Sequence, residues 1–224
     1  MKALQLPGGG RTLFTARAEG NMSSVCGEGA DEAEGARERL RCGLGLRRLA
    51  RGYQVHGKVV QRVGPVRAGQ PPGSRRAEAD GQATAQVAVG AMVLTADCMP
   101  VALGCDGAVA MVHAGWRGLA GGVLEEGLRA ISELGGGGEL VAIVGPCAGA
   151  CCYEVGPEVH EALAGARGAR GHIDLRAIAH ERLLAAGVAR VHDVPGCTIC
   201  DARYFSHRRE GTRAGRQAGV AWLS

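Results

Sequence analysis

The fold of this chain depends on the stretch TADCMPVALGCDGAVAMVHAGWRG, residues 95–118. An apolar run from Val87 to Leu103 is followed by a second run from Ala108 to Val112, with Gly104-Cys105-Asp106-Gly107 between them. Gly and Asp between two apolar runs are typical of a β-hairpin turn. We therefore expect two antiparallel strands joined at this turn.

The position of the turn decides how Cys98 and His113 are related. A turn centred on Cys105 and Asp106 makes Cys98 and His113 direct cross-strand neighbours, with Cβ atoms about 5 Å apart. A type I′ turn at Asp106 and Gly107 makes them diagonal neighbours on the same face of the sheet. Either register lets the two side chains share one ion. Pro100 predicts an edge or a bulge close to them.

His56, Cys98 and His113 form a candidate zinc set. Two imidazoles and one thiolate are natural zinc ligands, and three protein ligands leave a fourth position open for water or substrate. That pattern favours a catalytic metal over a structural one. Nothing in the local sequence brings His56, in Gln54-Val55-His56-Gly57, close to the hairpin.

Length and composition indicate one domain that covers residues 1–224. The net charge of +4 is mild and aromatic residues make up 3% of the chain, so stacking on nucleic-acid bases is poorly supported. The sequence has no apolar run of membrane-spanning length, and Met1–Gly8 lacks the apolar centre of a signal peptide. We expect a cytoplasmic protein whose nine cysteines are mostly buried thiols, with Cys98 as the exception.

Strands and helices are expected to alternate irregularly, which predicts an α+β layered domain with mixed sheets. The expected helices cover Asp31–Leu49, Leu119–Leu134, Pro157–Leu163 and a segment capped by Asp174 that ends before Gly187. Besides the hairpin, strands are expected at Thr12–Thr15, Val55–Val63, Leu140–Val144, Val188–Val194 and Gly219–Leu223. Gly64–Ala79 is expected to be an exposed loop.

The remaining cysteines give a weaker signal. Cys197-Thr198-Ile199-Cys200, with Cys147, Cys151 and Cys152 earlier in the chain, could form a second metal or redox site. One Cys-x-x-Cys without a matching second pair is weak evidence for a metal. The sequence alone therefore favours ordinary thiols here.

The quoted segments are similar to one known family. Gln54–Gly57, Thr95–Pro100 and Val112–Gly118, with Gly145–Val155 and the tail from Cys197 to Arg209, resemble the family long labelled multicopper polyphenol oxidase (laccase). The same family is also called the peptidoglycan editing factor family. Its members are understood as purine nucleoside phosphorylases with adenosine deaminase activity. The resemblance runs from Phe14 almost to the C-terminus.

The resemblance implies a layered α/β/β/α fold and one zinc ion held by His56, Cys98 and His113. It implies phosphorolysis of adenosine, inosine, guanosine and methylthioadenosine, and hydrolytic deamination of adenosine. The expected partners are purine nucleosides and phosphate, without nucleic acid or membrane, in a monomer or small homo-oligomer. The usual nucleobase-deaminase signature, His-x-Glu followed by Pro-Cys-x-x-Cys, is absent.

Both reactions need further groups. Cys98, His113 and Asp97 are the expected catalytic residues, and Asp80 and Glu154 are further candidates for the acid or base. For phosphate we expect Arg17, Arg117, Gly115 and Gly118, because a glycine-rich helix start offers free backbone N–H groups and arginine adds a charged fork. Arg208 or Arg209 could also reach the site.

Three other functions use the same residues differently. Cys98 could be the nucleophile and His113 the base of a thiol hydrolase acting on cell-wall precursors. A copper oxidase is physically implausible, because multicopper sites need His-x-His pairs and none of the seven histidines forms one. A binding domain could use the arginines that cluster between residues 37 and 51.

Overall fold

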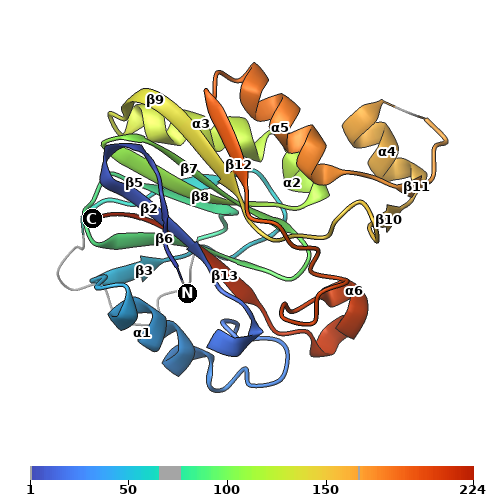
Figure 1. The fold of residues 1–224 in the computed structure, drawn as a ribbon, viewed down its shortest axis with the longest axis horizontal. Coiled ribbons are helices and arrows are strands. Elements are labelled where there is room, and N and C mark those ends of the chain that lie inside the picture. Colours follow the sequence, from blue (N-terminus) through green and yellow to red (C-terminus); the bar gives the residue numbers. More distant parts are fainter. Residues whose placement is uncertain (1, 66–76, 166) are drawn as a thin grey trace.

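The computed structural model describes residues 2–65, 77–165 and 167–224 (Figure 1). The strands in these ranges form two main sheets. The first has the order β1-β2-β13-β6-β3 and the second has the order β12-β9-β7-β8-β5-β4. Both sheets mix parallel and antiparallel pairs.

The bounds of the elements are as follows. The first sheet consists of β1 (Leu4–Gln5), β2 (Gly10–Phe14), β3 (Arg48–Ala50), β6 (Val89–Thr95) and β13 (Gln217–Leu223). The second consists of β4 (Val60–Arg62), β5 (Gly81–Thr84), β7 (Met99–Asp106), β8 (Ala108–Ala114), β9 (Gly137–Val144) and β12 (Arg190–Asp193), and a small pair joins β10 (Glu154–Val155) to β11 (Gly171–His172). The helices are α1 (Ala33–Gly43), α2 (Trp116–Gly121), α3 (Val123–Glu133), α4 (Pro157–Ala164), α5 (Leu175–Ala185) and α6 (His207–Glu210).

Four layers follow from the alternation of side chains along the strands. On β8, Ala110 and Val112 pack into the cluster that includes Leu124 and Ile131 of α3, whereas Met111 packs between the two sheets. On β13, Ala221 faces the same inter-sheet space. Its neighbours on that strand, Val220 and Trp222, pack against Leu40 of α1. Because successive side chains on a strand point to opposite faces, this alternation produces an α/β/β/α sandwich, with α1 below and α3 and α5 above in Figure 1.

The hairpin has the register of a turn at Asp106 and Gly107. Val101 pairs with Val112 and Pro100 pairs with His113, so Cys98 is the diagonal neighbour of His113. The turn itself is not type I′, since only Gly107 of the two turn residues has a positive φ, +84°. We expected the apolar run Val87–Leu103 to be one strand, but it is not. It divides into β6 of one sheet and β7 of the other, and Cys98 lies where the chain crosses between them.

Several expected elements differ from the observed ones. The helix over Asp31–Leu49, which we expected to be interrupted at Gly43 and Gly45, ends at Gly43, and Arg48–Ala50 pairs with β6 as a strand. The helix over Leu119–Leu134 starts at Trp116 and is broken at Gly122, whose φ is +91°. The strand over Val55–Val63 is reduced to Val60–Arg62. Most of the loop expected at Gly64–Ala79 lies outside the described residues.

The other expected elements are found close to their predicted bounds. The strands β2, β9, β12 and β13 and the helix α4 are in place. Asp174 caps α5 as expected, with its carboxylate accepting hydrogen bonds from the backbone N–H groups of Arg176 and Ala177. None of the helices in the described residues is both long and apolar enough to cross a bilayer.

Candidate active site and metal centre

His56, Cys98 and His113 lie together at the ends of the sheets. Their possible ligand atoms are all within 4.8 Å of one another, and the rings of His56 and His113 meet edge to face with centroids 4.9 Å apart. His113 is buried on β8, Cys98 is half-buried just before β7, and His56 is exposed on the loop before β4. The structure therefore brings together the three side chains that the sequence placed on separate segments.

Asp80 holds the His56 loop and His113 in place. This side chain is completely buried, and its carboxylate accepts hydrogen bonds from the backbone N–H groups of Val55, His56 and Gly57 at 3.1, 2.9 and 2.7 Å. One of its oxygens also lies 2.8 Å from Nδ1 of His113. This contact leaves Nε2 of His113 for the group in front of it, and a carboxylate behind a ligand histidine is the usual partner of a metal-binding imidazole.

The same carboxylate explains why the strand expected over Val55–Val63 does not begin until Val60. The N–H groups of Val55–Gly57 bind Asp80 instead of a neighbouring strand, and His56 has a φ of +61°. Asp97, next to Cys98, has a φ of +89°. Non-glycine residues rarely adopt such angles, and they persist where surrounding contacts hold them. One of these strained residues, His56, belongs to the cluster, and the other precedes Cys98 directly.

Electrostatics in the cluster favour a thiolate beside a protonated imidazole. Burial alone would raise the pKa of Cys98, but the charges and hydrogen bonds of His113 and His56 outweigh it and lower the pKa to about 6. Burial alone would lower the pKa of His113, but Cys98 and Asp80 raise it to about 9. For Asp80, hydrogen bonds from His113 and the backbone outweigh burial and lower the pKa. Thiolate is the form of cysteine that binds a metal.

The cluster opens into a pocket of about 540 Å³. Its walls combine aromatic and basic groups with a single acidic side chain, Asp97, among the described lining residues. The aromatic side chains are Tyr53, Trp116 and Tyr153, and the arginines are Arg51, Arg117, Arg208 and Arg216. A second hollow of similar volume, between α1 and the first sheet, has no histidine or cysteine among its described lining residues.

Asp97 joins this pocket to the C-terminal part of the chain. Its carboxylate accepts a hydrogen bond of 2.7 Å from Oγ1 of Thr198 and another of 2.7 Å from the backbone N–H of Arg208. Of the three acid or base candidates, only Asp97 lines the pocket. Asp80 is enclosed behind His113, and the backbone carbonyl of Glu154 accepts a hydrogen bond from Arg208.

Two of the four expected phosphate-binding residues line the pocket and two do not. Gly115 and Arg117 line the pocket, and the Arg117 guanidinium lies 4.1 Å from the centre of the Trp116 ring. Arg17 does not line it; its side chain pairs with Glu210 and lies 4.3 Å from the centre of the Phe205 ring. Gly118 is a packing position, because a Cβ there would come within 2.8 Å of the Gly57 carbonyl oxygen.

Gly115 also has a steric reason to be glycine. A Cβ at this position would be 3.1 Å from Sγ of Cys98 and 3.1 Å from Cδ2 of His56, which is tighter than ordinary contact. Sequence reasoning gave Gly115 an anion-binding role and missed this steric role.

Sequence reasoning also missed Gln54. Its side-chain amide forms hydrogen bonds of 2.8 Å with both the backbone N–H and the carbonyl of Leu94, and so fixes the His56 loop to the end of β6.

Comparison with known proteins gives a consistent result. A family model described as multi-copper polyphenol oxidoreductase laccase matches residues 10–224. A Xylella fastidiosa protein named purine nucleoside phosphorylase is 40% identical over 91% of this chain and 84% of its own length. The Escherichia coli K12 protein named purine nucleoside phosphorylase YfiH is 35% identical over 91% of this chain and 86% of its own length.

Solved structures agree with these relatives. A crystal structure of a Neisseria meningitidis protein of the DUF152 family superimposes with a TM-score of 0.84 and 30% identity. It covers 100% of this chain and 98% of the other. The two chains therefore share the whole fold.

Proposed function

This chain belongs to the family described as multi-copper polyphenol oxidoreductase laccase, and we propose that it is a zinc-dependent purine nucleoside phosphorylase with adenosine deaminase activity. One observation carries the proposal: the Asp80-supported His113 meets Cys98 and His56 at a pocket rich in arginine and aromatic side chains. The names of the relatives supply the reaction class. We further propose a cytoplasmic protein built as one domain.

The three ligand candidates fit zinc. Two imidazoles and a thiolate within 4.8 Å of one another are a zinc-type donor set, and three ligands leave a position on the pocket side. Zinc bound by His56, Cys98 and His113 would supply a Lewis acid and make water in the open position more acidic, which suits deamination at C6 of adenine. The two histidines and Cys98 orient this site, and Asp80 fixes the tautomer of His113.

For phosphorolysis, the pocket must bind phosphate and nucleoside side by side. Phosphate attacks C1′ of the ribose while the bond from C1′ to the purine breaks, so the site must hold an anion beside the sugar. Arg117 and Arg208 lie on the pocket wall with guanidinium groups that can bind phosphate in a forked manner. Because α2 has six residues, its N-terminal field is small, and we assign most of the anion binding to these arginines.

Asp97 and the aromatic side chains complete the proposed complex. Thr198 and the Arg208 backbone already donate to Asp97, which suits its carboxylate to accepting a further hydrogen bond from a ribose hydroxyl. Tyr53, Trp116 and Tyr153 offer apolar surfaces to the purine. Trp116 also packs against the core cluster, so its ring has a structural role as well.

The test is to incubate the protein with adenosine, with and without phosphate, and separate the products. Adenine with ribose 1-phosphate, formed only with phosphate, supports phosphorolysis, and inosine supports deamination. Inosine, guanosine and methylthioadenosine as substrates then define the range. A protein that forms neither product at any zinc loading would contradict the proposal. His180→Ala is a suitable control. His180 lies on α5, pairs with Asp193 of β12 and does not line the pocket.

One observation favours a second candidate, a thiol hydrolase of peptidoglycan precursors. A Cys98 thiolate beside a protonated His113 is the pair such an enzyme uses. Covalent trapping of Cys98 by an electrophile in metal-free, fully active protein would support this candidate. Zinc content that falls by one ion per chain in Cys98→Ala, together with loss of activity, would support the first.

A further inference from the structure

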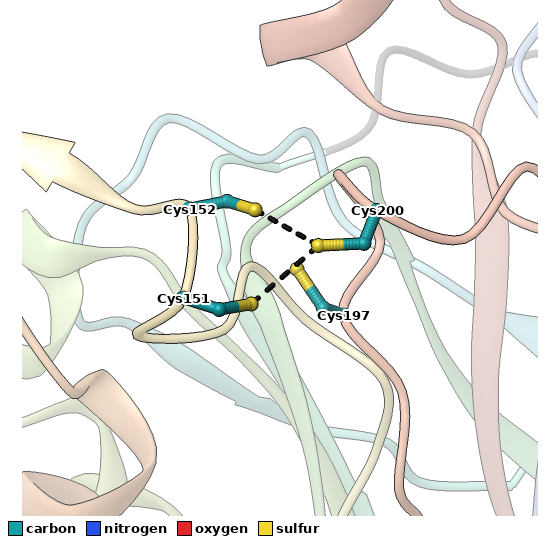
Figure 2. Close-up of side chains that lie close together, drawn as sticks. All are labelled: Cys151, Cys152, Cys197 and Cys200. Atoms are coloured by element: carbon teal, nitrogen blue, oxygen red, sulfur yellow. Dashed lines mark hydrogen bonds between the residues drawn. The ribbon is translucent and has the colours of Figure 1, made fainter.

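Four other cysteines meet on the outside of the fold. The sulfur atoms of Cys151, Cys152, Cys197 and Cys200 all lie within 4.8 Å of one another, and Figure 2 shows the four side chains pointing toward a common centre. Cys200 is 2.8 Å from Cys152 and 3.5 Å from Cys151, sulfur to sulfur. All four are free thiols, and Cys151 and Cys200 are exposed. The expectation that most of the nine cysteines are buried is wrong, since two of them, Cys105 and Cys147, are buried. The reactions proposed above do not use these four side chains.

The topology explains why two distant segments meet here. Cys151 and Cys152 follow β9, and Cys197 and Cys200 follow β12. These strands are parallel neighbours, so the segments that leave their C-terminal ends start side by side. The backbones of Cys147 and Cys197 form an isolated parallel β-bridge between the two segments. In it, the Thr198 N–H donates a hydrogen bond of 3.0 Å to the Cys147 carbonyl.

The local backbone is arranged around the sulfur atoms. The N–H of Gly149 donates a hydrogen bond to Sγ of Cys197 at 3.3 Å. Such donors stabilise a thiolate, which is the ligand form of cysteine. A Cβ on Gly149 would be 3.2 Å from Cβ of Cys197, so glycine allows the two segments to approach this closely.

We propose that Cys151, Cys152, Cys197 and Cys200 bind one zinc ion as a structural site. Four cysteines are the closed, tetrahedral donor set of structural zinc, whose Zn–S bonds of about 2.3 Å place the sulfurs roughly 3.8 Å apart. The observed group, within 4.8 Å, has this scale. A cluster of several iron atoms distributes its cysteines over more than one metal, which needs a wider spacing.

Zinc at this site would fasten one wall of the pocket. Tyr153, which lines the pocket, directly follows Cys152, and Thr198, which donates to Asp97, directly follows Cys197. The four sulfurs therefore tie together the two segments that position Tyr153 and Asp97. This role is structural, because the four cysteines leave no coordination position for substrate.

Metal content tests the proposal in a background where the first site is disabled. Zinc per chain is measured by mass spectrometry of purified, reduced protein after exposure to zinc and removal of unbound ion. Cys98→Ala is expected to keep one zinc, and the double variant Cys98→Ala with Cys200→Ser is expected to lose it. Cys42→Ser in the same background is the matched control, since Cys42 is an exposed cysteine on α1 away from the cluster. Equal zinc in all three proteins would overturn the proposal.

Cobalt substitution gives a second readout that needs no variant in the cluster. Cobalt(II) added to reduced Cys98→Ala protein is expected to produce strong sulfur-to-cobalt absorption at a one-to-one ratio, displaced by zinc. Absence of this absorption, a disulfide between Cys152 and Cys200 in protein prepared under reducing conditions, or stoichiometric iron in place of zinc would each refute the zinc site. None of these readouts depends on nucleoside activity, so failure here is distinct from failure of the proposed function.

Discussion

The two cysteine-containing clusters are built in opposite ways. His56, Cys98 and His113 mix nitrogen and sulfur, open into a pocket, and are held from behind by the buried carboxylate of Asp80. The second cluster, residues 151, 152, 197 and 200, is all sulfur and has two exposed members. The first arrangement leaves room for chemistry, whereas the second is closed on itself.

The fold separates the residues proposed for reactivity from those proposed for stability. In the first cluster, Cys98 lies where the chain crosses from β6 to β7, and two non-glycine residues have a positive φ, His56 of the cluster and Asp97 next to Cys98. Strain of this kind needs support from surrounding contacts, and Asp80 and the partners of Asp97 provide it. The second cluster joins segments that parallel strands already place together. Variants should therefore affect activity at one cluster and stability at the other.

The largest expected effect is the loss of activity in Cys98→Ala. Removing the thiolate leaves two histidines to hold the metal, and phosphorolysis should fall by more than about 100-fold, beyond the range typical for groups that only support a ligand. Initial rates with adenosine and phosphate measure it, with circular dichroism to verify folding. Cys200→Ser should keep most of its activity. Comparable losses in both variants would remove the distinction between the clusters.

Asp80→Asn should have the next largest effect. The amide keeps the size of the side chain but removes the charge that faces His113, and its NH₂ group cannot accept the backbone hydrogen bonds that the carboxylate accepts. Loss of such a supporting carboxylate typically lowers metal affinity or activity by roughly 10- to 100-fold. Zinc titration and rates together measure it. Asp193→Asn, at the partly exposed Asp193–His180 pair outside the pocket, should leave zinc affinity and rates near those of the wild type.

Gly115→Ala should have a smaller effect of the same kind. The added methyl group would meet Sγ of Cys98 and Cδ2 of His56 at 3.1 Å, so both must shift by a few tenths of an ångström. Misplacement on this scale should reduce kcat by roughly tenfold, since reacting groups tolerate little displacement. Gly43→Ala, where the added methyl group meets nothing within 4 Å, is the control and should be active. An unchanged kcat in Gly115→Ala would show that this position tolerates a side chain.

The sequence predicted the first cluster better than the second for a physical reason. The turn residues limit the hairpin to two registers, and both place Cys98 near His113; the observed one makes them diagonal neighbours. His56 depends on contacts with Asp80, which lies 24 residues further along the chain, so only the family resemblance pointed to it. Local patterns do not contain contacts of this kind.

For a similar reason, the sequence lent the second cluster only weak support and did not predict the strand break. Cys197-x-x-Cys200 is weak evidence alone, and its partners Cys151 and Cys152 are adjacent residues on a segment that follows a different strand. Their meeting depends on the parallel pairing of β9 with β12, which no local signal predicts. The break between β6 and β7 relies on Asp97 at φ +89°, a conformation expected of glycine.

Stability should distinguish the clusters in the reverse direction. Zinc present at roughly 100 times its Kd would stabilise the folded chain by about 2.7 kcal/mol, so Cys200→Ser should lower the zinc-dependent Tm by roughly 5 to 10 °C. Thermal unfolding of Cys200→Ser and Cys42→Ser in zinc measures the difference. A Tm that zinc raises equally in both proteins would contradict a structural role for the second cluster.

The smallest effect we expect is a difference of about two protons released on zinc binding. At about pH 8 the first cluster holds one proton between Cys98 and His113, because the pKa of the thiol is lowered to about 6 and that of the imidazole is raised to about 9. Zinc displaces that proton.

In the second cluster, burial would raise the pKa of Cys197, but backbone N–H groups from Cys200 and Gly149 lower it to about 7. The contact with Cys152 raises the pKa of Cys200 to about 11, and the contact with Cys200 raises that of Cys151. For Cys152, the contact with Cys200 lowers the pKa, but the contact with Cys151 and desolvation have the larger combined effect. The pKa of Cys152 is therefore raised. Three thiols are therefore protonated at about pH 8, and zinc should release about three protons.

Protons compete with the metal, so zinc affinity rises with pH at both clusters, roughly tenfold per pH unit at the first and roughly 1,000-fold at the second. Calorimetric titration in buffers of different ionisation enthalpy counts the protons, using Cys200→Ser to isolate the first cluster and Cys98→Ala to isolate the second. Equal numbers of protons released at the two clusters would mean that the clusters carry the same number of displaceable protons before zinc binds, and would contradict this prediction.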